Sequence, residues 1–435
     1  MTATMIGPGL PPPHRPYEAF SLPSFRRYLA GLLFITLAWG VQAVVVGWQV
    51  YELTGDEYAL GLVGLCEFIP SFLVTPIAGN LADRKCRRKL ALIGAMGLLA
   101  ASLALVAVAF MSRGSGPNDD GPMHARWIYG ILIVAGLFRG LTTPARSALG
   151  SEVVPREMLA TAISLRTSTW QIGAVLGPAL GGLAYKFGGA STSYLVDAGL
   201  IIAAAFAFAL IRITPRTITV AADEPFFAGI TEGWRCLKER KEIIAALTLD
   251  LVAVLFGGAV ALLPVFAKDI LHAGPGTLGL LRSAPSLGAV AVALVITHLP
   301  PFERAGRAMI IAVVGFGVAT IGFALSKDVW LSGLFLAMTG ACDYVSVVVR
   351  HTLVQVRTPP HMLGRVTALN ALFIGSSNEL GAYESGLAAR LMGTIPSVVF
   401  GGCMTILSAV VAFFTCPPLR NLKRLRDADP HQNTD

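Results

Sequence analysis

The run Gly79-Asn80-Leu81-Ala82-Asp83-Arg84-Lys85-Cys86-Arg87-Arg88-Lys89 places five cations in six positions between two long apolar stretches. Apolar residues dominate Tyr58 to Ile77 before this run and Leu90 to Met111 after it. So many charges do not lie in hydrocarbon, and short loops rich in Lys and Arg stay on the cytoplasmic side of a membrane. The run therefore predicts an inside turn between two membrane-spanning helices.

The composition of the whole chain is that of a membrane protein. The 435 residues are 54% hydrophobic and only 14% charged, and the mean hydropathy is +0.66. Soluble globular proteins are less apolar than this. The formal net charge is +8, but the Lys and Arg residues stand in short loops beside apolar segments, so we expect a lipid bilayer and no nucleic acid as partner. The six cysteines show neither a disulfide framework nor zinc-ligand spacing, and we expect no metal or cofactor.

Apolar runs of about 20 residues predict an all-α polytopic protein with twelve membrane-spanning helices. The first six are expected near Tyr28–Val50, Tyr58–Ala78, Leu90–Met111, Trp127–Leu149, Ala160–Tyr185 and Tyr194–Ile213. The second six are expected near Ile243–Phe266, Leu278–His298, Ala308–Leu325, Val329–Val349, Val366–Leu391 and Ser397–Phe414.

Basic residues fall on alternate loops, which predicts that both termini are cytoplasmic. These loops contain Arg26 and Arg27, Arg84 to Lys89, Arg146 to Arg166, Arg216 to Lys241, Arg304 and Arg307, Arg350 to Arg365, and Arg420 to Arg426. The predicted domains are a cytoplasmic leader (1–27), a six-helix bundle (28–213), a linker (214–242), a second six-helix bundle (243–416) and a cytoplasmic tail (417–435). The linker is expected to end in an amphipathic helix, over 229–241, on the cytoplasmic face of the membrane.

The two predicted bundles repeat one another in sequence. A shift of 204 residues places Gly136 on Gly340, Arg146 on Arg350, Pro155 on Pro359 and Gly182 on Gly386. A shift of 220 residues places Asp83-Arg84 on Glu303-Arg304 and Arg87 on Arg307, so a degenerate copy of the opening run stands in the second half. Two pseudo-symmetric bundles with a cytoplasmic linker form the architecture of transporters whose site lies at mid-membrane.

The opening run resembles the loop between the second and third helices of major facilitator superfamily transporters. In that signature a Gly, an Asp-Arg pair and a basic cluster form a conformational latch, although Cys86 stands here where the family usually has Gly. The resemblance implies a latch of Gly79, Asp83, Arg84, Arg87 and Arg88, with Glu303, Arg304 and Arg307 in the second half. The runs 60–70, 262–271, 279–285 and 362–366 resemble the bacterial branch that exports enterobactin and macrolides, which implies outward movement of a small amphipathic molecule.

A second motif lies in the fifth predicted span, Gly173-x-x-x-Gly177-Pro178-x-x-Gly181-Gly182. It resembles the Gly/Pro motif of antiporters. Small residues at i and i+4 let helix backbones approach closely, and Pro178 allows a bend. Tight helix packing without any antiporter role is the alternative interpretation.

Charged residues inside the predicted spans are the candidates for proton coupling and for contacts in a central cavity. They are Glu67, Arg139, Asp250, Asp343 and Glu379. Glu67 lies half-way along its span, where burial penalises its charged form and suits reversible protonation. Arg139 matches the position of a buried Arg in antiporters of the family, and under the 204-residue shift it falls on Asp343. Asp250 has an alternative interpretation as a helix end or part of an ion pair.

The sequence contains no nucleotide-binding loop and no nucleophile motif, so we expect a secondary transporter and not an enzyme. The prediction is an exporter in the bacterial inner membrane that moves a siderophore, a drug or a metabolite by alternating access, in exchange for protons. The family is usually monomeric. The alternatives are a proton-coupled importer of a small solute, and a membrane sensor or scaffold that transports nothing.

Overall fold

The computed structural model describes residues 18–84, 86–212, 232, 234–238, 240–298, 303–359 and 362–422, and every regular element in these ranges is helical. The long helices are α1 (Pro23–Thr54), α2 (Glu57–Arg84), α3 (Arg87–Met111), α4 (Gly121–Glu152), α5 (Leu159–Ala209), α7 (Lys241–Phe256), α9 (Pro275–His298), α10 (Ala305–Leu325), α11 (Val329–Arg357), α12 (Leu363–Met392) and α13 (Thr394–Thr415). The short elements are η1 (Glu18–Ser21), η2 (Arg156–Met158), η3 (Ala259–Leu262), α8 (Leu263–Val265), η4 (Phe266–Ile270) and α14 (Pro417–Arg420).

The number of membrane crossings is consistent with the twelve that the sequence predicts. By length and composition, ten helical stretches in the described ranges are able to cross a membrane. One of them, α5, has 51 residues and would extend about 77 Å if it were straight, far more than the thickness of a bilayer. Its helical backbone is interrupted at Gly189, where φ is 68° and ψ is −171°, so α5 provides two crossings. The helix α12 is outside the ten, and its 30 residues are long enough for another.

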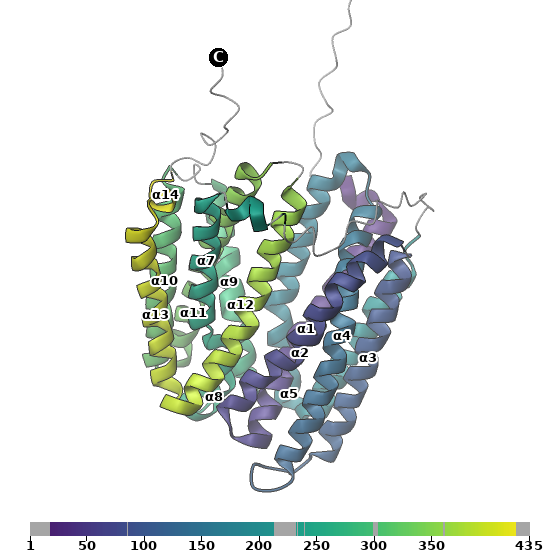
Figure 1. Ribbon diagram of the computed structural model, residues 1–435. Coiled ribbons are helices and arrows are strands. Elements are labelled where there is room, and N and C mark those ends of the chain that lie inside the picture. Colours follow the sequence, from purple (N-terminus) through teal and green to yellow (C-terminus); the bar gives the residue numbers. More distant parts are fainter. Residues whose placement is uncertain are drawn as a thin grey trace, which may run out of the picture.

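The helices form two groups (Figure 1). The N-terminal group comprises α1 to α5, which pack on one another, and the C-terminal group comprises α7 to α14. Between the groups, α5 packs on α9 and α2 packs on α12. The domain limits at 27, 213, 242 and 416 stay a prediction. The ranges 1–17, 213–231 and 423–435, which include most of the predicted linker, lie outside the described residues.

Glycines that match under the 204-residue shift make equivalent contacts in the two groups. A Cβ atom on Gly136 in α4 would lie 2.3 Å from the carbonyl oxygen of Glu67 in α2. A Cβ atom on Gly340 in α11 would lie 1.9 Å from the carbonyl oxygen of Pro285 in α9. Both distances are impossible for a real side chain, so these glycines allow the backbones of neighbouring helices to touch.

The turn after α2 does not need the glycine that the family usually has there. Cys86 has φ of −62° and ψ of 109° and caps the start of α3, which is ordinary extended backbone for any residue. The departure from the family pattern at this position therefore costs no backbone strain.

Two arginines that were counted with the basic loops lie inside helices, and one of them, Arg146, is also within the predicted span Trp127–Leu149. Arg146 belongs to α4 and Arg350 to α11, and their exposed fractions are 6% and 2%. The sequence prediction grouped both with the basic loops because neighbouring cations follow them. The error has a physical reason: a buried arginine needs a partner from another helix, and charge counting along the chain does not reveal such partners.

Candidate functional site: a central cavity between the two groups

A cavity of about 560 Å³ lies between the two groups of helices. Cavities of this size accept small organic molecules. Its charged and amide side chains are Gln42, Glu67 and Arg139 from the N-terminal group and Arg282, Asp343, Asn378 and Glu379 from the C-terminal group. Its aromatic lining comprises Trp39, Trp170, Phe316 and Phe323. Four of the five sequence-predicted candidates therefore face one space, and the exception is Asp250.

Glu67 and Arg139 form an ion pair across the wall of this cavity. The Arg139 Nη2 atom lies 2.7 Å from Glu67 Oε1, and the two side chains are 24% and 19% exposed. The guanidinium also donates to Gln42 Oε1 at 3.5 Å and lies 4.7 Å from the centre of the Trp39 ring. Arg146 approaches the same ring at 4.5 Å. Trp39 therefore contacts two cations, and an arginine held by a carboxylate and a ring keeps a defined position.

Glu379 reaches from α12 to the opposite group. A Cβ atom on Gly64 would lie 2.7 Å from Glu379 Oε2, so this carboxylate rests against α2 one helical turn from Glu67. The absence of a side chain at Gly64 makes room for it. Arg282 in α9 lines the same cavity and interacts electrostatically with both Glu379 and Glu67. The interface between the groups thus brings together charges from α2, α9 and α12.

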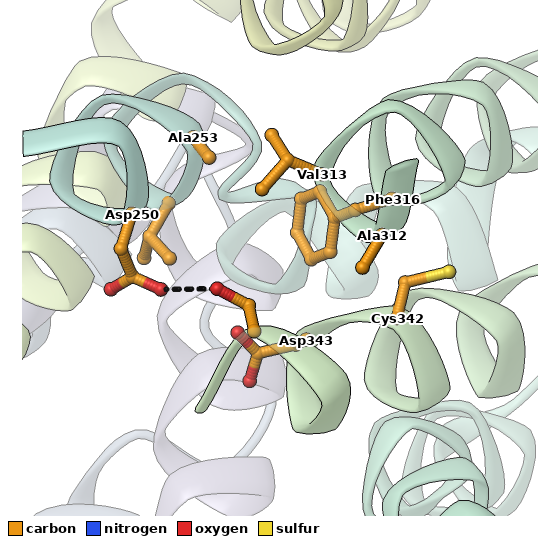
Figure 2. A pocket seen from close by; sticks show the side chains of 9 residues that line it. Asp250, Ala253, Ala312, Val313, Phe316, Cys342 and Asp343 are labelled. Atoms are coloured by element: carbon orange, nitrogen blue, oxygen red, sulfur yellow. Dashed lines mark hydrogen bonds between the residues drawn. The ribbon is translucent and has the colours of Figure 1, made fainter. Parts of the chain in front are cut away.

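Asp250 is directed away from the central cavity, into the C-terminal group. Its carboxylate forms an ion pair with Arg350 and accepts a hydrogen bond of 3.3 Å from Ser346 Oγ. Asp250 and Asp343 both line a small cavity of about 10 Å³, and Figure 2 shows their carboxylates near one another at its edge. Asp343 lines both cavities. For Asp250 the ion-pair interpretation therefore describes the structure, and contact with the central cavity does not.

The two groups touch at the end of the molecule where α1 ends and α2 begins, which we call the closed end. A Cβ atom on Gly182 in α5 would lie 2.9 Å from the Cα of Gly279 in α9. A Cβ atom on Gly386 in α12 would lie 3.0 Å from the Cα of Gly61 in α2. Gly182 and Gly386 are a pair under the 204-residue shift, so the two contacts are related by the internal repeat.

Polar side chains complete the closed end. Tyr58 and Tyr383 share a hydrogen bond of 3.3 Å, and Arg390 lies 3.5 Å from Asp56. Tyr51 also donates a hydrogen bond to Asp269, which is in η4 of the other group. Sequence reasoning missed this set because its members stand singly near helix ends, and nothing in their spacing along the chain shows that they meet.

The latch residues lie at the opposite end, which we call the loop end. Arg87 approaches Glu152 in α4 at 3.7 Å, and Arg88 donates to the carbonyl oxygen of Ile211 at 2.7 Å. Both contacts stay within the N-terminal group. A Cβ atom on Gly79 would meet open space. The side chains of Asp83 and Arg84 are outside the described residues, and Glu303, Arg304 and Arg307 are exposed. The latch stays a prediction.

The Gly/Pro motif of α5 packs against α1. Cβ atoms on Gly173, Gly177 and Gly181 would lie within 3 Å of atoms in Thr36, Leu37 and Val41 respectively. The carbonyl oxygen of Pro178 and the backbone of Gly182 face α9 instead. The motif therefore serves close helix packing on two sides, and a role in exchange with protons stays a prediction.

Comparison with known proteins identifies the family. The chain matches the Transmembrane secretion effector family over residues 15–433. It belongs to the major facilitator superfamily. The members of this superfamily are transporters and not enzymes, and the chain is a multi-pass membrane protein of that class.

Individual members of the superfamily resemble the chain along nearly its whole length. The enterobactin exporter EntS of Salmonella typhimurium is 26% identical over 414 residues, which cover 94% of this chain and 95% of that protein. The inward-open xylose transporter XylE from E. coli has a TM-score of 0.65 at 15% identity and covers 92% of this chain and 96% of its own. An inward-facing bacterial homologue of the human lysosomal transporter Spinster also has a TM-score of 0.65, at 14% identity, and covers 92% of this chain and 97% of its own. The two structural likenesses show the fold.

Proposed function

We propose that this major facilitator protein exports a small amphipathic molecule, such as a siderophore, a drug or a metabolite, by alternating access in exchange for protons. The observation that carries the proposal is the central cavity, because both groups of helices build it and four intramembrane charged residues of the predicted set line it. Relatives named as enterobactin exporters, similar over 94% of the chain, support the outward direction.

The proposed orientation places the loop end in the cytoplasm of a bacterial cell and the closed end outside the inner membrane. The basic loops support it, since Lys and Arg collect on the cytoplasmic side. We propose that in this orientation the structure, which is closed at the outer end, is the state from which the exporter loads its substrate. We propose that the Asp83–Arg84 latch forms in the opposite state, and that the protein acts as a monomer.

Glu67 is our first choice for the proton site. Its carboxylate forms an ion pair with Arg139, so loss of the charge of Glu67 would release the arginine and change the contacts of α2 with α4. We propose that Arg139, Asp343 and Glu379 contact the substrate or sense its charge. Asp250 acts indirectly, because its ion pair with Arg350 fixes α11, which carries Asp343.

The test is efflux of fluorescent amphipathic compounds and catecholate siderophores from cells that express the protein, with and without a protonophore. Glu67→Gln removes the titratable group and is expected to lower protonophore-sensitive efflux at least about tenfold, which corresponds to ~1.4 kcal/mol of lost coupling. Glu384→Gln is the matched control, because Glu384 lies in α12 outside the cavity lining. We expect it to keep efflux within about twofold of the wild type.

Other results of the efflux assay would favour another coupling residue or one of the alternative functions. Efflux by Glu67→Gln that still collapses with the protonophore would transfer the coupling role to Asp343 or Glu379. Protonophore-sensitive uptake in place of efflux would establish the importer. A wild-type protein that moves none of the compounds in either direction would contradict the transport proposal and favour a sensor or scaffold.

A further inference from the structure

We propose that the transported molecule is an organic cation and that Asp343 is the counter-ion for its positive group. This inference rests on the proposed transport function and narrows its substrate class. It depends on which charges of the cavity are already balanced and on the apolar surface around Asp343.

The charges that line the central cavity do not cancel. Its described lining has three carboxylates, Glu67, Asp343 and Glu379, and two guanidiniums, Arg139 and Arg282. Arg139 forms an ion pair with Glu67, with 2.7 Å between Nη2 and Oε1. Arg282 lies in the field of Glu379 and Glu67. Within the described lining, Asp343 is therefore the carboxylate that remains without a cation.

The surroundings of Asp343 within the C-terminal group supply no cation either. Among the residues that the structure describes, none forms an ion pair or a hydrogen bond with its carboxylate. Arg350, seven residues further along α11, is paired with Asp250. In Figure 2 the carboxylate of Asp250 faces the small cavity from α7 while Asp343 borders it from α11. Because Asp250 and Arg350 balance one another, this pair supplies no counter-charge to Asp343.

The end of α7 and the backbone that follows it border the same place. Ala253 and Val254 belong to its last turn and line the small cavity together with Asp343. The helix ends at Phe256, and the irregular backbone that follows, from Gly257 to Ala261, lines the central cavity. The last carbonyl oxygens of α7 lie against neighbouring helices, those of Val254 and Leu255 beside Gly381 in α12 and that of Phe256 beside Gly401 in α13. A positive group in the cavity would therefore be stabilised at this place by the Asp343 carboxylate.

Apolar and aromatic side chains surround the same part of the cavity. Phe316 lines both cavities beside Asp343, and Phe323 and Leu336 line the larger one. A ring face attracts a cation and an apolar surface accepts a hydrophobic body. The matching ligand is therefore a hydrophobic molecule with a delocalised or amine cation, small enough for about 560 Å³.

The test uses two ions of nearly the same shape and opposite charge, tetraphenylphosphonium and tetraphenylborate. Binding of each is measured to the purified full-length protein in lipid nanodiscs, with empty nanodiscs as the blank. We expect the wild type to bind the phosphonium at least about tenfold more tightly than the borate, and Asp343→Asn to lose at least about tenfold in phosphonium affinity. Asp343→Glu keeps the charge and is expected to retain binding within about threefold.

Glu384→Gln serves as the control for removal of a carboxylate outside the cavity, and a melting curve for each variant confirms that it is folded. Equal binding of the two ions, tighter binding of the borate, no binding of either ion by the wild type, or a folded Asp343→Asn with unchanged phosphonium affinity would each overturn the inference. Efflux from cells of uncharged or anionic compounds, without any preference for cations, would be compatible with the export proposal. It would refute the proposal that the substrate is an organic cation.

Discussion

Two arginines at equivalent positions of the repeat illustrate how a buried charge is accommodated. Arg350 is 2% exposed and is paired with Asp250, whereas Arg146, which is 6% exposed, lies over the ring of Trp39. The first has a full counter-charge, whereas the contact described for the second is the weaker attraction of an aromatic face. The internal repeat thus conserves the position of the cation and changes its partner.

The ion pair of Asp250 and Arg350 should respond asymmetrically to substitution. Arg350→Met leaves Asp250 buried without its cation, and we expect a loss of roughly 3–5 kcal/mol in stability. The double variant Asp250→Leu, Arg350→Met removes both charges and should recover most of that loss. Thermal denaturation of the detergent-solubilised protein, followed by size-exclusion fluorescence, measures both effects.

Arg307→Met is the matched control for this series, because Arg307 is exposed at the start of α10. It should change stability by less than about 0.5 kcal/mol. The account would be wrong if Arg350→Met melted at the temperature of the wild type, or if the double variant were less stable than the single one.

At the scale of elements, the helix that begins the second group is broken where the sequence predicts a continuous span. The prediction was one helix near Ile243–Phe266, but α7 ends at Phe256 and is followed by η3, α8 and η4. Gly257 and Gly258 stand at the break, and glycine favours such interruptions because it loses more conformational freedom in a helix than other residues. Irregular backbone is tolerated at membrane depth here because it lines a cavity and not lipid.

The contact between α5 and α9 provides a test of the closed end. A Cβ atom on Gly182 would lie 2.6 Å from the carbonyl oxygen of Pro275, whereas a Cβ atom on Gly199 would meet nothing within 4 Å. Gly182→Val is expected to separate α5 from α9 at a cost of roughly 1–3 kcal/mol and to reduce efflux. Gly199→Val lies in the second part of the same helix and should leave efflux close to that of the wild type. Equal efflux by the two variants would show that this contact is not needed in the transport cycle.

For the whole molecule, alternating access requires the closed end to open. The two groups meet there through backbone contacts of Gly61 with Gly386 and through the pair Tyr58 and Tyr383, whose ring centroids are 5.7 Å apart. These contacts are reversible hydrogen bonds and packing contacts, so the same surfaces are able to separate. Transport should therefore stop when they are joined covalently.

We expect Tyr58→Cys, Tyr383→Cys, in a background without the six native cysteines, to be joined by a short bifunctional thiol reagent. Cross-linking should abolish efflux, and a reductant that cleaves the reagent should restore it. Each single cysteine variant, treated in the same way, controls for modification alone. Undiminished efflux by the cross-linked protein would contradict a cycle in which this end opens.

The membrane-spanning architecture could be predicted from the chain alone, and the arrangement of its charges could not. Apolar run length and basic loops are properties of adjacent residues, and the bilayer converts them directly into helices of a given length and direction. The internal repeat is likewise visible by comparing the two halves of the sequence. These patterns also marked Glu67, Arg139, Asp343 and Glu379 as charges at membrane depth, and all four line the cavity.

Only the tertiary structure decided which of these charges are paired. Glu67 meets Arg139, Asp250 turns inward to Arg350, and Asp343 is left facing the cavity. The closed end likewise depends on tertiary contacts. It includes Tyr51, Asp56 and Tyr58 because η4 and α12 pack beside these residues. The physical reason is that partners on different helices are chosen by the rotation, tilt and close packing of those helices, which no spacing along a single segment records.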